Sequence, residues 1–254
     1  TAGNSESFVA MGYKKTIQVP EYIVRTGLDA YESQCGRGVR ISEEAAREFG
    51  QKARENSVTL SLHSPNYISL SSIEKEKRDG SIEYILHSAR AADAMGAQRV
   101  VVHSGSCSKI SREEALELAK DTLKRAYQAL DEQNLGHIHL CPETMGNVNQ
   151  LGTMEEVLEL CLTDERLIPC IDFGHLNART FGRLNSFEAV KEVFDKMEDK
   201  LGASRMRQFH SHFSKIEYTL KGGEKCHLTF ADTIYGPQFE PVAEMIVRKN
   251  ARPT

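Results

Sequence analysis

The sequence contains little that would place the protein at a membrane or outside the cell. No apolar run among its 254 residues is long enough to span a bilayer, although 40% of the residues are hydrophobic. The first ten residues, TAGNSESFVA, lack the basic and then apolar order of a signal peptide. The six cysteines form no CxxC pair, which favours free thiols in a reducing cytosol over a disulfide framework. We therefore expect a cytoplasmic, monomeric protein without a membrane partner.

The sequence also lacks a large excess of charge of one sign. Lysine and arginine number 32 against 36 aspartates and glutamates, which gives a net charge of −4. This balance provides no overall attraction toward nucleic acid. It does not exclude a nucleic-acid substrate, because metal ions that line a groove bring their own positive charge.

Five apolar runs each end in a residue that can bind a metal ion. The runs VTLSLH, RVVVH, HIHLCPE, LIPCID and MRQFH end at His63, His103, Glu143, Asp172 and His210. When every second residue is counted back from each terminal residue, the positions that are skipped are mostly large and apolar. Because strand side chains alternate between faces, the five chelating groups are expected to share a face. Imidazoles and carboxylates at successive strand ends are what a parallel barrel needs to build a metal site on one rim.

Strand-like and helix-like segments alternate along the chain. Six strands are expected: residues 28–34 and the five runs above. The expected helices cover residues 43–56 after the cap Ser42, 81–95, 112–134 after Ser111, 154–161 after Thr153, 186–200 and 237–249. We interpret the charged segment 73–81 and the segment after MRQFHSH as loops. Strands that alternate with helices of this length predict βαβ units and a parallel sheet.

The fold class predicted from this order is α/β, specifically a (β/α)8 TIM barrel. The length suits a single domain over residues 1–254. Six strands are two short of a closed barrel, and the chain opens in a loop-like segment and stops directly after a helix. We therefore expect the first and last strands to be missing at the two ends.

Several motifs together resemble the endonuclease IV family, which is apurinic/apyrimidinic endonuclease family 2. They are HSPNY, VVHSGS, CPETMGNVNQLGT, CIDFGH, FHSHFSK and KCH, between about residues 58 and 230. The resemblance implies a xylose-isomerase-like TIM barrel that binds three zinc ions. It also implies that the protein hydrolyses DNA 5′ to abasic sites in base excision repair.

The resemblance assigns metal ligands by motif. His63, His103 and Glu143 would hold one zinc. Glu143 would bridge to a second zinc, also bound by Asp172 and His210, and would be the central catalytic residue. The implied third site uses His175 and His227. The chemistry is reasonable on its own terms, because two metal ions bridged by a carboxylate activate water and stabilise a phosphate during transfer.

The chain departs from the family pattern at two places. Lys225 stands where the family has the aspartate of the third zinc site, so we expect that site to be partly occupied or empty unless Glu224, Cys226 or Asp232 substitutes. The glutamate expected for the second metal would lie beyond residue 254. Two or three Zn²⁺ ions are therefore expected, with Mn²⁺ as an alternative metal.

Other polar residues keep more than one interpretation. His212 would be a ligand, a proton relay or a rim residue. His137 and His139 are expected in the barrel interior, and His87 is expected to serve packing or to lie on the surface. Arg37 is a candidate for contact with a DNA phosphate. Tyr67 is a candidate for stacking on a base at an abasic site, or is simply packed in its loop.

A second function class remains open on the same barrel. A sugar isomerase or epimerase would use one or two Mn²⁺, Co²⁺ or Mg²⁺ ions to polarise a hydroxy-carbonyl group. His63 and His103 favour the nuclease, since imidazole-rich sites suit zinc. Lys225 and the lost aspartate favour the sugar enzyme, or a nuclease that has drifted from the family pattern. The partner is therefore abasic DNA or, in the alternative, a small sugar.

Overall fold

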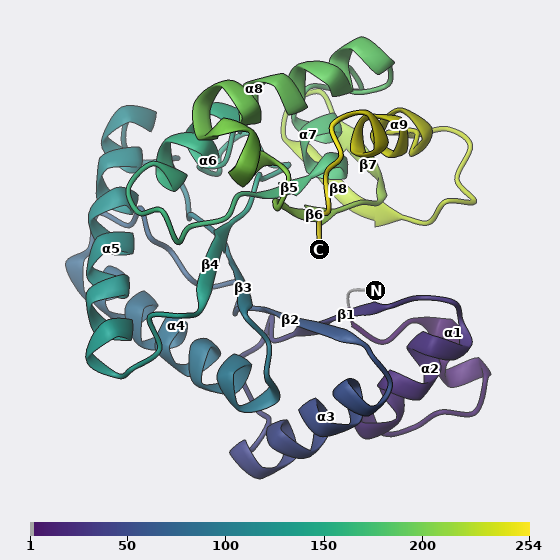
Figure 1. Cartoon of the computed structure of the whole chain (residues 1–254). Helices are drawn as coiled ribbons and strands as arrows, with labels where there is room; N and C mark the ends of the chain where they lie inside the picture. The colour runs from purple at the N-terminus through teal and green to yellow at the C-terminus, as the bar shows by residue number, and fades with distance from the viewer. Residues whose placement is uncertain (1–2) are drawn as a thin grey trace. The chain divides into compact units, whose positions relative to one another are not determined.

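The computed structural model of the protein describes residues 3–254 (Figure 1). Thr1 and Ala2, at the end where a strand is expected to be missing, lie outside this range. The strands are β1 (Ala30–Gln34), β2 (Thr59–His63), β3 (Arg99–Val102), β4 (His139–Pro142), β5 (Cys170–Asp172), β6 (His210–His212), β7 (Lys215–Thr219) and β8 (Gly223–Leu228). The helices are α1 (Glu6–Ala10), the short 3-10 helix η1 (Thr16–Gln18), α2 (Val19–Arg25), α3 (Glu43–Glu55), α4 (Lys75–Met95), α5 (Arg112–Glu132), α6 (Met154–Cys161), α7 (Phe173–Arg179), α8 (Phe187–Met206) and α9 (Glu240–Arg248).

Contacts divide the chain into two compact units. Unit 1 comprises residues 1–68, 76–102 and 124–140, and unit 2 comprises residues 69–75, 103–123 and 141–254. Each unit is described by itself below. The expectation of one domain over the whole chain stays a prediction.

In unit 1 the strands pair in parallel and in chain order. Strand β1 pairs with β2 and β2 with β3, and the same sheet continues to β4. Helix α3 begins after Ser42 as expected, because the Ser42 hydroxyl accepts a hydrogen bond of 3.2 Å from the Ala45 amide. A side chain at Gly50 of α3 would place its Cβ only 2.1 Å from the carbonyl oxygen of Met95. Glycine at this position therefore lets α3 and the end of α4 meet backbone to backbone.

Helix α4 begins earlier than expected. The segment 73–81 was interpreted as a loop, but all of it from Lys75 onward is helical. Its lysines, glutamates and arginine are good helix formers, so the charged turns extend a helix that the buried Ile82, Ile85 and Leu86 anchor. A run of solvated charges was mistaken for a loop because the anchoring apolar residues all follow it.

In unit 2 the parallel arrangement continues. Strands β5 and β6 pair in parallel, and Glu143, directly after β4, forms a parallel bridge with Cys170 of β5. The Thr254 amide donates to the Phe209 carbonyl, and the Ser211 amide donates to the Thr254 carbonyl. This alternation is the hydrogen-bond pattern of parallel strands, so the last residues extend the sheet beside β6.

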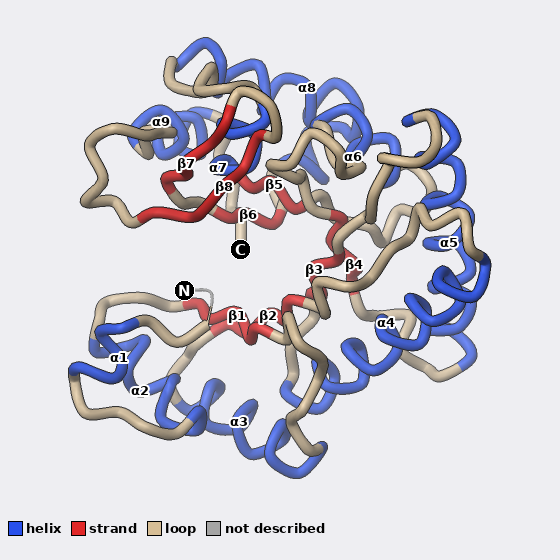
Figure 2. The backbone as a smooth tube through the Cα atoms, turned by 180° about the vertical axis from the view of Figure 1, so that it is seen from behind, coloured by secondary structure: helices blue, strands red, loops and turns tan. Residues whose placement is uncertain are grey.

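The segment after β6 differs from the expected long loop. It contains an antiparallel hairpin, β7 and β8, which packs against α7 (Figure 2). Helix α7 itself was not expected, and it begins directly after Asp172, whose side chain caps it. The turn of the hairpin and the start of β8 also contact residues 146–148, which lie far away in the sequence.

The last two helices keep their expected places with shifted ends. Helix α8 continues to Met206 across a break at Gly202, where φ is 81°. Helix α9 begins at Glu240, after Phe239, and not at Pro237. It packs against α8. None of the helices in residues 3–254 is both long and apolar enough to cross a membrane.

Candidate metal centre

Glu143 lies at the centre of the polar cluster in unit 2. It follows β4 and is only 1% exposed. Its Oε1 lies 2.7 Å from Nδ1 of His212, and its Oε2 lies 3.1 Å from Nε2 of His103. The two oxygens of one buried carboxylate therefore face two different imidazoles, which is the geometry that a bridging ligand needs.

Asp172 ends β5 and orients the next part of the cluster. Its Oδ1 accepts a 2.7 Å hydrogen bond from the His175 amide, which caps α7. Its Oδ2 lies 3.5 Å from Nδ1 of His175 and 3.9 Å from Nδ1 of His212. The Thr144 hydroxyl holds the Asp172 backbone by accepting from its amide at 2.9 Å. Asp172 thus presents one oxygen to the cluster while the other begins a helix.

His210 and His212 share one face of β6. Their ring centroids are 5.2 Å apart at 80°. His212 has ligand atoms near those of Cys170 and His210, and near those of Glu143 and Asp172. Sequence reasoning left three roles open for His212, and its position beside Glu143 supports the ligand interpretation. The signal was its spacing of two residues from His210, which gives both the same face.

His175 and His227 meet across Glu224. The ring centroids of the histidines are 5.2 Å apart. Burial lowers the pKa of His175, but the carboxylates of Asp172, Glu224 and Glu143 outweigh it and raise the pKa to about 10. The neighbouring imidazoles of His175 and His227 hold the pKa of Glu224 well below its usual range, despite its burial. Together the three side chains bring one carboxylate and two imidazoles close to one another.

His63 belongs to unit 1, where it ends β2. It is 7% exposed, and its Nδ1 lies 2.9 Å from the carbonyl oxygen of Ser64. A carbonyl only accepts, so Nδ1 donates and Nε2 is left as the possible ligand atom. Its role as a ligand beside His103 stays a prediction.

The remaining histidines do not join the cluster. His137 was expected in the barrel interior, but it precedes β4, its side chain is 54% exposed, and it contacts Asp93 at 2.9 Å. His139 opens β4 and is partly exposed, and His87 lies on α4. The interior interpretation of His137 was wrong because the strand starts two residues later than the apolar pattern indicated.

The two candidate DNA contacts lie in loops of unit 1. Arg37 is exposed after β1. Tyr67 is 50% exposed, and its ring packs edge-on against Tyr84 at a centroid distance of 4.6 Å. The Tyr67 ring is therefore packed on one side and accessible on another. DNA contact by either residue stays a prediction.

Two arginines hold the loop that follows Glu143. Arg112 makes a two-pronged ion pair with Glu156, at 2.6 and 2.7 Å, and donates to the carbonyls of Val148 and Gln150. Arg179, at the end of α7, donates to the carbonyls of Met145, Asn147 and Gln150. The loop therefore has few ways to move, and it supports the backbone around the cluster.

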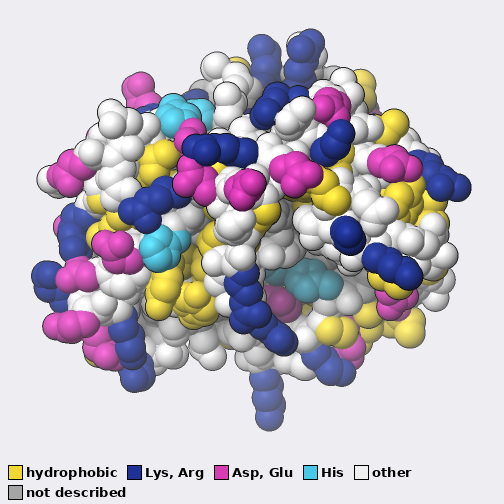
Figure 3. Space-filling model, turned by 90° about the horizontal axis from the view of Figure 1, so that it is seen from below, with side chains coloured by type: hydrophobic (Ala, Val, Ile, Leu, Met, Phe, Trp, Pro, Cys, Tyr) yellow, Lys and Arg dark blue, Asp and Glu magenta, His cyan; other side chains and the backbone are white. Residues whose placement is uncertain are grey.

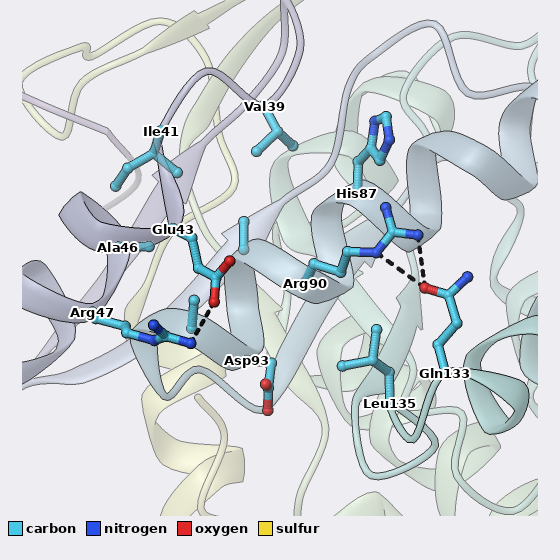
Figure 4. A pocket seen from close by; sticks show the side chains of 12 residues that line it. Val39, Ile41, Glu43, Ala46, Arg47, His87, Arg90, Asp93, Gln133 and Leu135 are labelled. Atoms are coloured by element: carbon cyan, nitrogen blue, oxygen red, sulfur yellow. Dashed lines mark hydrogen bonds and ion pairs between the residues drawn. The ribbon is translucent and has the colours of Figure 1, made fainter.

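A separate groove in unit 1 has no comparable chemistry. It lies among α3, α4 and the end of α5 (Figure 4). Arg90 donates there to the Gln133 side chain, and Arg47 pairs with Glu43. It includes His87 but none of the clustered chelating residues, so we assign the candidate site to unit 2.

Charges of both signs are interspersed over the face shown in Figure 3. Lysine and arginine side chains alternate there with acidic ones, in keeping with the small net charge. On that face, attraction of a phosphate would depend on local groups and not on a broad basic surface.

Comparison with known proteins establishes the family. Residues 20–250 match the family described as the xylose isomerase-like TIM barrel. The chain belongs to this family, so the expected α/β TIM-barrel fold class is confirmed. The resemblance to endonuclease IV is confirmed as well.

Individual relatives carry different names. The chain is 34% identical over 204 residues to an uncharacterized protein of Methanocaldococcus jannaschii, covering 80% of this chain and 72% of that protein. It is 25% identical over 176 residues to a probable endonuclease 4 of Acholeplasma laidlawii, covering 62% of this chain and 59% of that protein. A solved D-tagatose 3-epimerase-like protein is 20% identical with a TM-score of 0.67, covering 92% of this chain and 82% of that one. At that identity the structural likeness shows the fold alone.

Proposed function

We propose that the protein is a zinc-dependent phosphodiesterase that resembles endonuclease IV and hydrolyses DNA 5′ to abasic sites in base excision repair. One observation carries the proposal: the two oxygens of buried Glu143 face His212 and His103 separately. A carboxylate in this position can hold two cations close together. The similarity to a probable endonuclease 4 supports the same activity.

The ligand sets follow from the strand ends. His103 and one Glu143 oxygen would bind the first ion, with His63 as the further ligand expected from the sequence. The other Glu143 oxygen, Asp172, His210 and His212 would bind the second. Imidazole-rich sets of this kind suit zinc better than magnesium. Such a pair of ions supplies a hydroxide nucleophile at neutral pH and neutralises charge on the phosphate.

The protein side chains contribute orientation and access. His103 is 15% exposed and His212 is 16% exposed, whereas Glu143 is almost fully covered. The carboxylate is therefore shielded, while the imidazoles border solvent from which a phosphate can enter. The arginine-held loop after Glu143 keeps this arrangement from collapsing when the ions are absent.

A sugar epimerase is the second candidate. The D-tagatose 3-epimerase-like structure has the same fold, and the close group of Glu143, Asp172 and His212 offers enough ligand atoms for a single ion. The surplus of imidazoles at His103, His175, His210 and His227 favours the nuclease, because one ion does not need them. The two candidates therefore differ in the number of ions bound and in the substrate.

The test uses the purified chain loaded with zinc and a duplex that carries one abasic site. We expect cleavage of the damaged strand on the 5′ side of the lesion, leaving a 3′-hydroxyl, and no cleavage of the same duplex without the lesion. Glu143→Gln should abolish the activity, whereas Glu43→Gln, on the exposed face of α3, should retain it. Failure to cut at any zinc concentration, together with epimerisation of a ketohexose, would establish the second candidate instead.

A further inference from the structure

The hairpin β7–β8 contains an extra residue beside the cluster. Glu217 of β7 pairs with Cys226, and the next residue, Tyr218, pairs with Glu224. Lys225 therefore has no partner of its own, and the register shifts by one residue. This is a β-bulge, a feature that bends a strand and redirects its side chains.

The bulge sends Lys225 to the side of the hairpin where Glu217 lies. Its Nζ lies 2.5 Å from Oε1 of Glu217, and Cys226 Sγ lies 3.4 Å from Oε2 of the same carboxylate. In a regular strand, residues 225 and 227 would share a face and residue 224 would lie on the other. Here Glu224 and His227 instead lie together on the side facing His175.

The two imidazoles both point Nε2 at Glu224. Nδ1 of His175 donates to the Thr144 carbonyl at 2.8 Å, and Nδ1 of His227 lies 2.8 Å from the Ser214 hydroxyl. The Nδ1 atom of each ring is thus held by a neighbouring group, and the Nε2 atom faces Glu224. Metal-binding histidines are oriented in this way by a second partner on the far nitrogen.

The distances match ligands that share an ion. Glu224 Oε2 lies 3.5 Å from His175 Nε2, and Oε1 lies 3.4 Å from His227 Nε2. These separations are long for a hydrogen bond. Two ligand atoms at about 2.05 Å from a tetrahedral zinc are about 3.3 Å apart. The arrangement is therefore closer to an ion-binding geometry than to a tight ion pair.

We propose that Glu224, His175 and His227 form a third zinc site, in which the β-bulge at Lys225 brings Glu224 into the role that the family gives to the residue one position later. The ammonium group of Lys225 points toward Glu217 on the opposite side of the hairpin, away from the three ligands. The Glu224 side chain is 25% exposed and that of His227 is 50% exposed, so a fourth position is open to water or a phosphate oxygen. The third site rests on the proposed zinc-dependent function. Its test, however, measures zinc binding and not nuclease activity.

The experiment counts zinc in the full-length chain. The protein is stripped with a chelator, reloaded with excess zinc, desalted and analysed by elemental mass spectrometry. Glu224→Gln should bind one zinc fewer than the wild type. Glu217→Gln makes the same change of charge in the same hairpin but on the other side, and it should keep the wild-type count. Lys225→Asp should also keep that count, because its side chain points toward Glu217.

A second variant and a second measurement distinguish the loss of a ligand from misfolding. His227→Gln replaces a half-exposed side chain and should lose the same zinc. With cobalt in place of zinc, both Glu224→Gln and His227→Gln should lose the same component of the visible absorption. In a Glu143→Gln background, adding Glu224→Gln should remove one further zinc.

Two results would overturn the proposal: a wild-type chain that holds no zinc beyond those bound through Glu143, or a Glu224→Gln chain with undiminished zinc. Either would mean that Glu224 only neutralises a protonated His175. A chain that binds the third zinc through Glu224 yet leaves abasic DNA uncut would refute the proposed activity and leave this site standing.

Discussion

His212 Nδ1 lies 2.7 Å from Oε1 of Glu143, on the strand next to the one that Cys170 and Asp172 occupy. A second carboxylate oxygen, Oε2, faces His103. The buried carboxylate is therefore flanked by imidazoles from β6 and from the end of β3. This contact is a hydrogen bond, and both groups would be ligands in the proposed metal site.

Glu143→Gln tests the bridge directly. The amide has the same shape but no negative charge, so we expect loss of at least one zinc and of nearly all hydrolysis of abasic DNA. A chelator should likewise abolish activity in the wild type, and added zinc should restore it. Metal content and cleavage rate are measured on the same samples. Retention of both metals and of the rate would show that Glu143 is not a bridge.

His212→Asn tests whether this imidazole is a ligand. We expect the zinc affinity of the site in unit 2 to fall by at least about 10–100-fold. Removal of a residue that only orients a metal ligand already has an effect of this size. His137→Asn is the matched control, because His137 is exposed and pairs with Asp93. Competition with a chromophoric chelator gives both affinities. Equal affinities would leave His212 as a rim residue.

Glu156→Gln tests the ion pair that holds the loop after Glu143. Arg112 and the amides of Thr153 and Gly152 donate to this carboxylate. We expect a loss of about 2–3 kcal/mol in the free energy of unfolding, measured by urea denaturation at pH 7. Glu155→Gln removes an exposed ion pair with Lys196 and should cost less than about 1 kcal/mol.

The Glu156 pair also predicts a pH dependence. Burial raises the pKa of Glu156, but hydrogen bonds from Arg112, Thr153 and Gly152 outweigh it, so the folded-state pKa lies below the ordinary value. The stabilisation is therefore complete above the unfolded-state pKa of about 4.3 and is lost as the pH falls through the folded-state value. The stability difference between wild type and Glu156→Gln should shrink below about pH 4. A constant difference down to pH 3 would exclude this carboxylate as the cause.

Gly50→Ala tests the close approach of α3 and α4. The new methyl group would meet the Met95 carbonyl oxygen, and we expect a loss of about 1–3 kcal/mol in stability. Gly80→Ala is the control within α4, since no atom lies within 4 Å of its added Cβ. It should stabilise the protein by about 0.5–1 kcal/mol, because alanine restricts the unfolded chain. Thermal unfolding compares the two, and equal effects would contradict the packing argument.

Much of the fold and part of the candidate site could be predicted from local sequence patterns. All six expected strands are present, and His103, Glu143 and Asp172 stand at or directly after strand ends as expected, whereas His210 begins β6 and does not end it. The caps Ser42 and Thr153 begin α3 and α6 at the expected residues. These features were predictable because the period of two in a strand and the chemistry of a helix cap depend only on neighbouring residues.

The rest was decided by contacts between distant segments. The role of Glu224 depends on the bulge at Lys225, which arises in the register by which β8 pairs with β7, next to a bridge between Gly223 and Asn147 of the loop after β4. Without that pairing, regular alternation would place Lys225 beside His227, as the sequence alone suggests. The sequence by itself therefore determined which residue types reach the strand ends. Tertiary hydrogen bonding determined which carboxylate meets the last two histidines, because a shift of one residue in register moves a side chain to the other face.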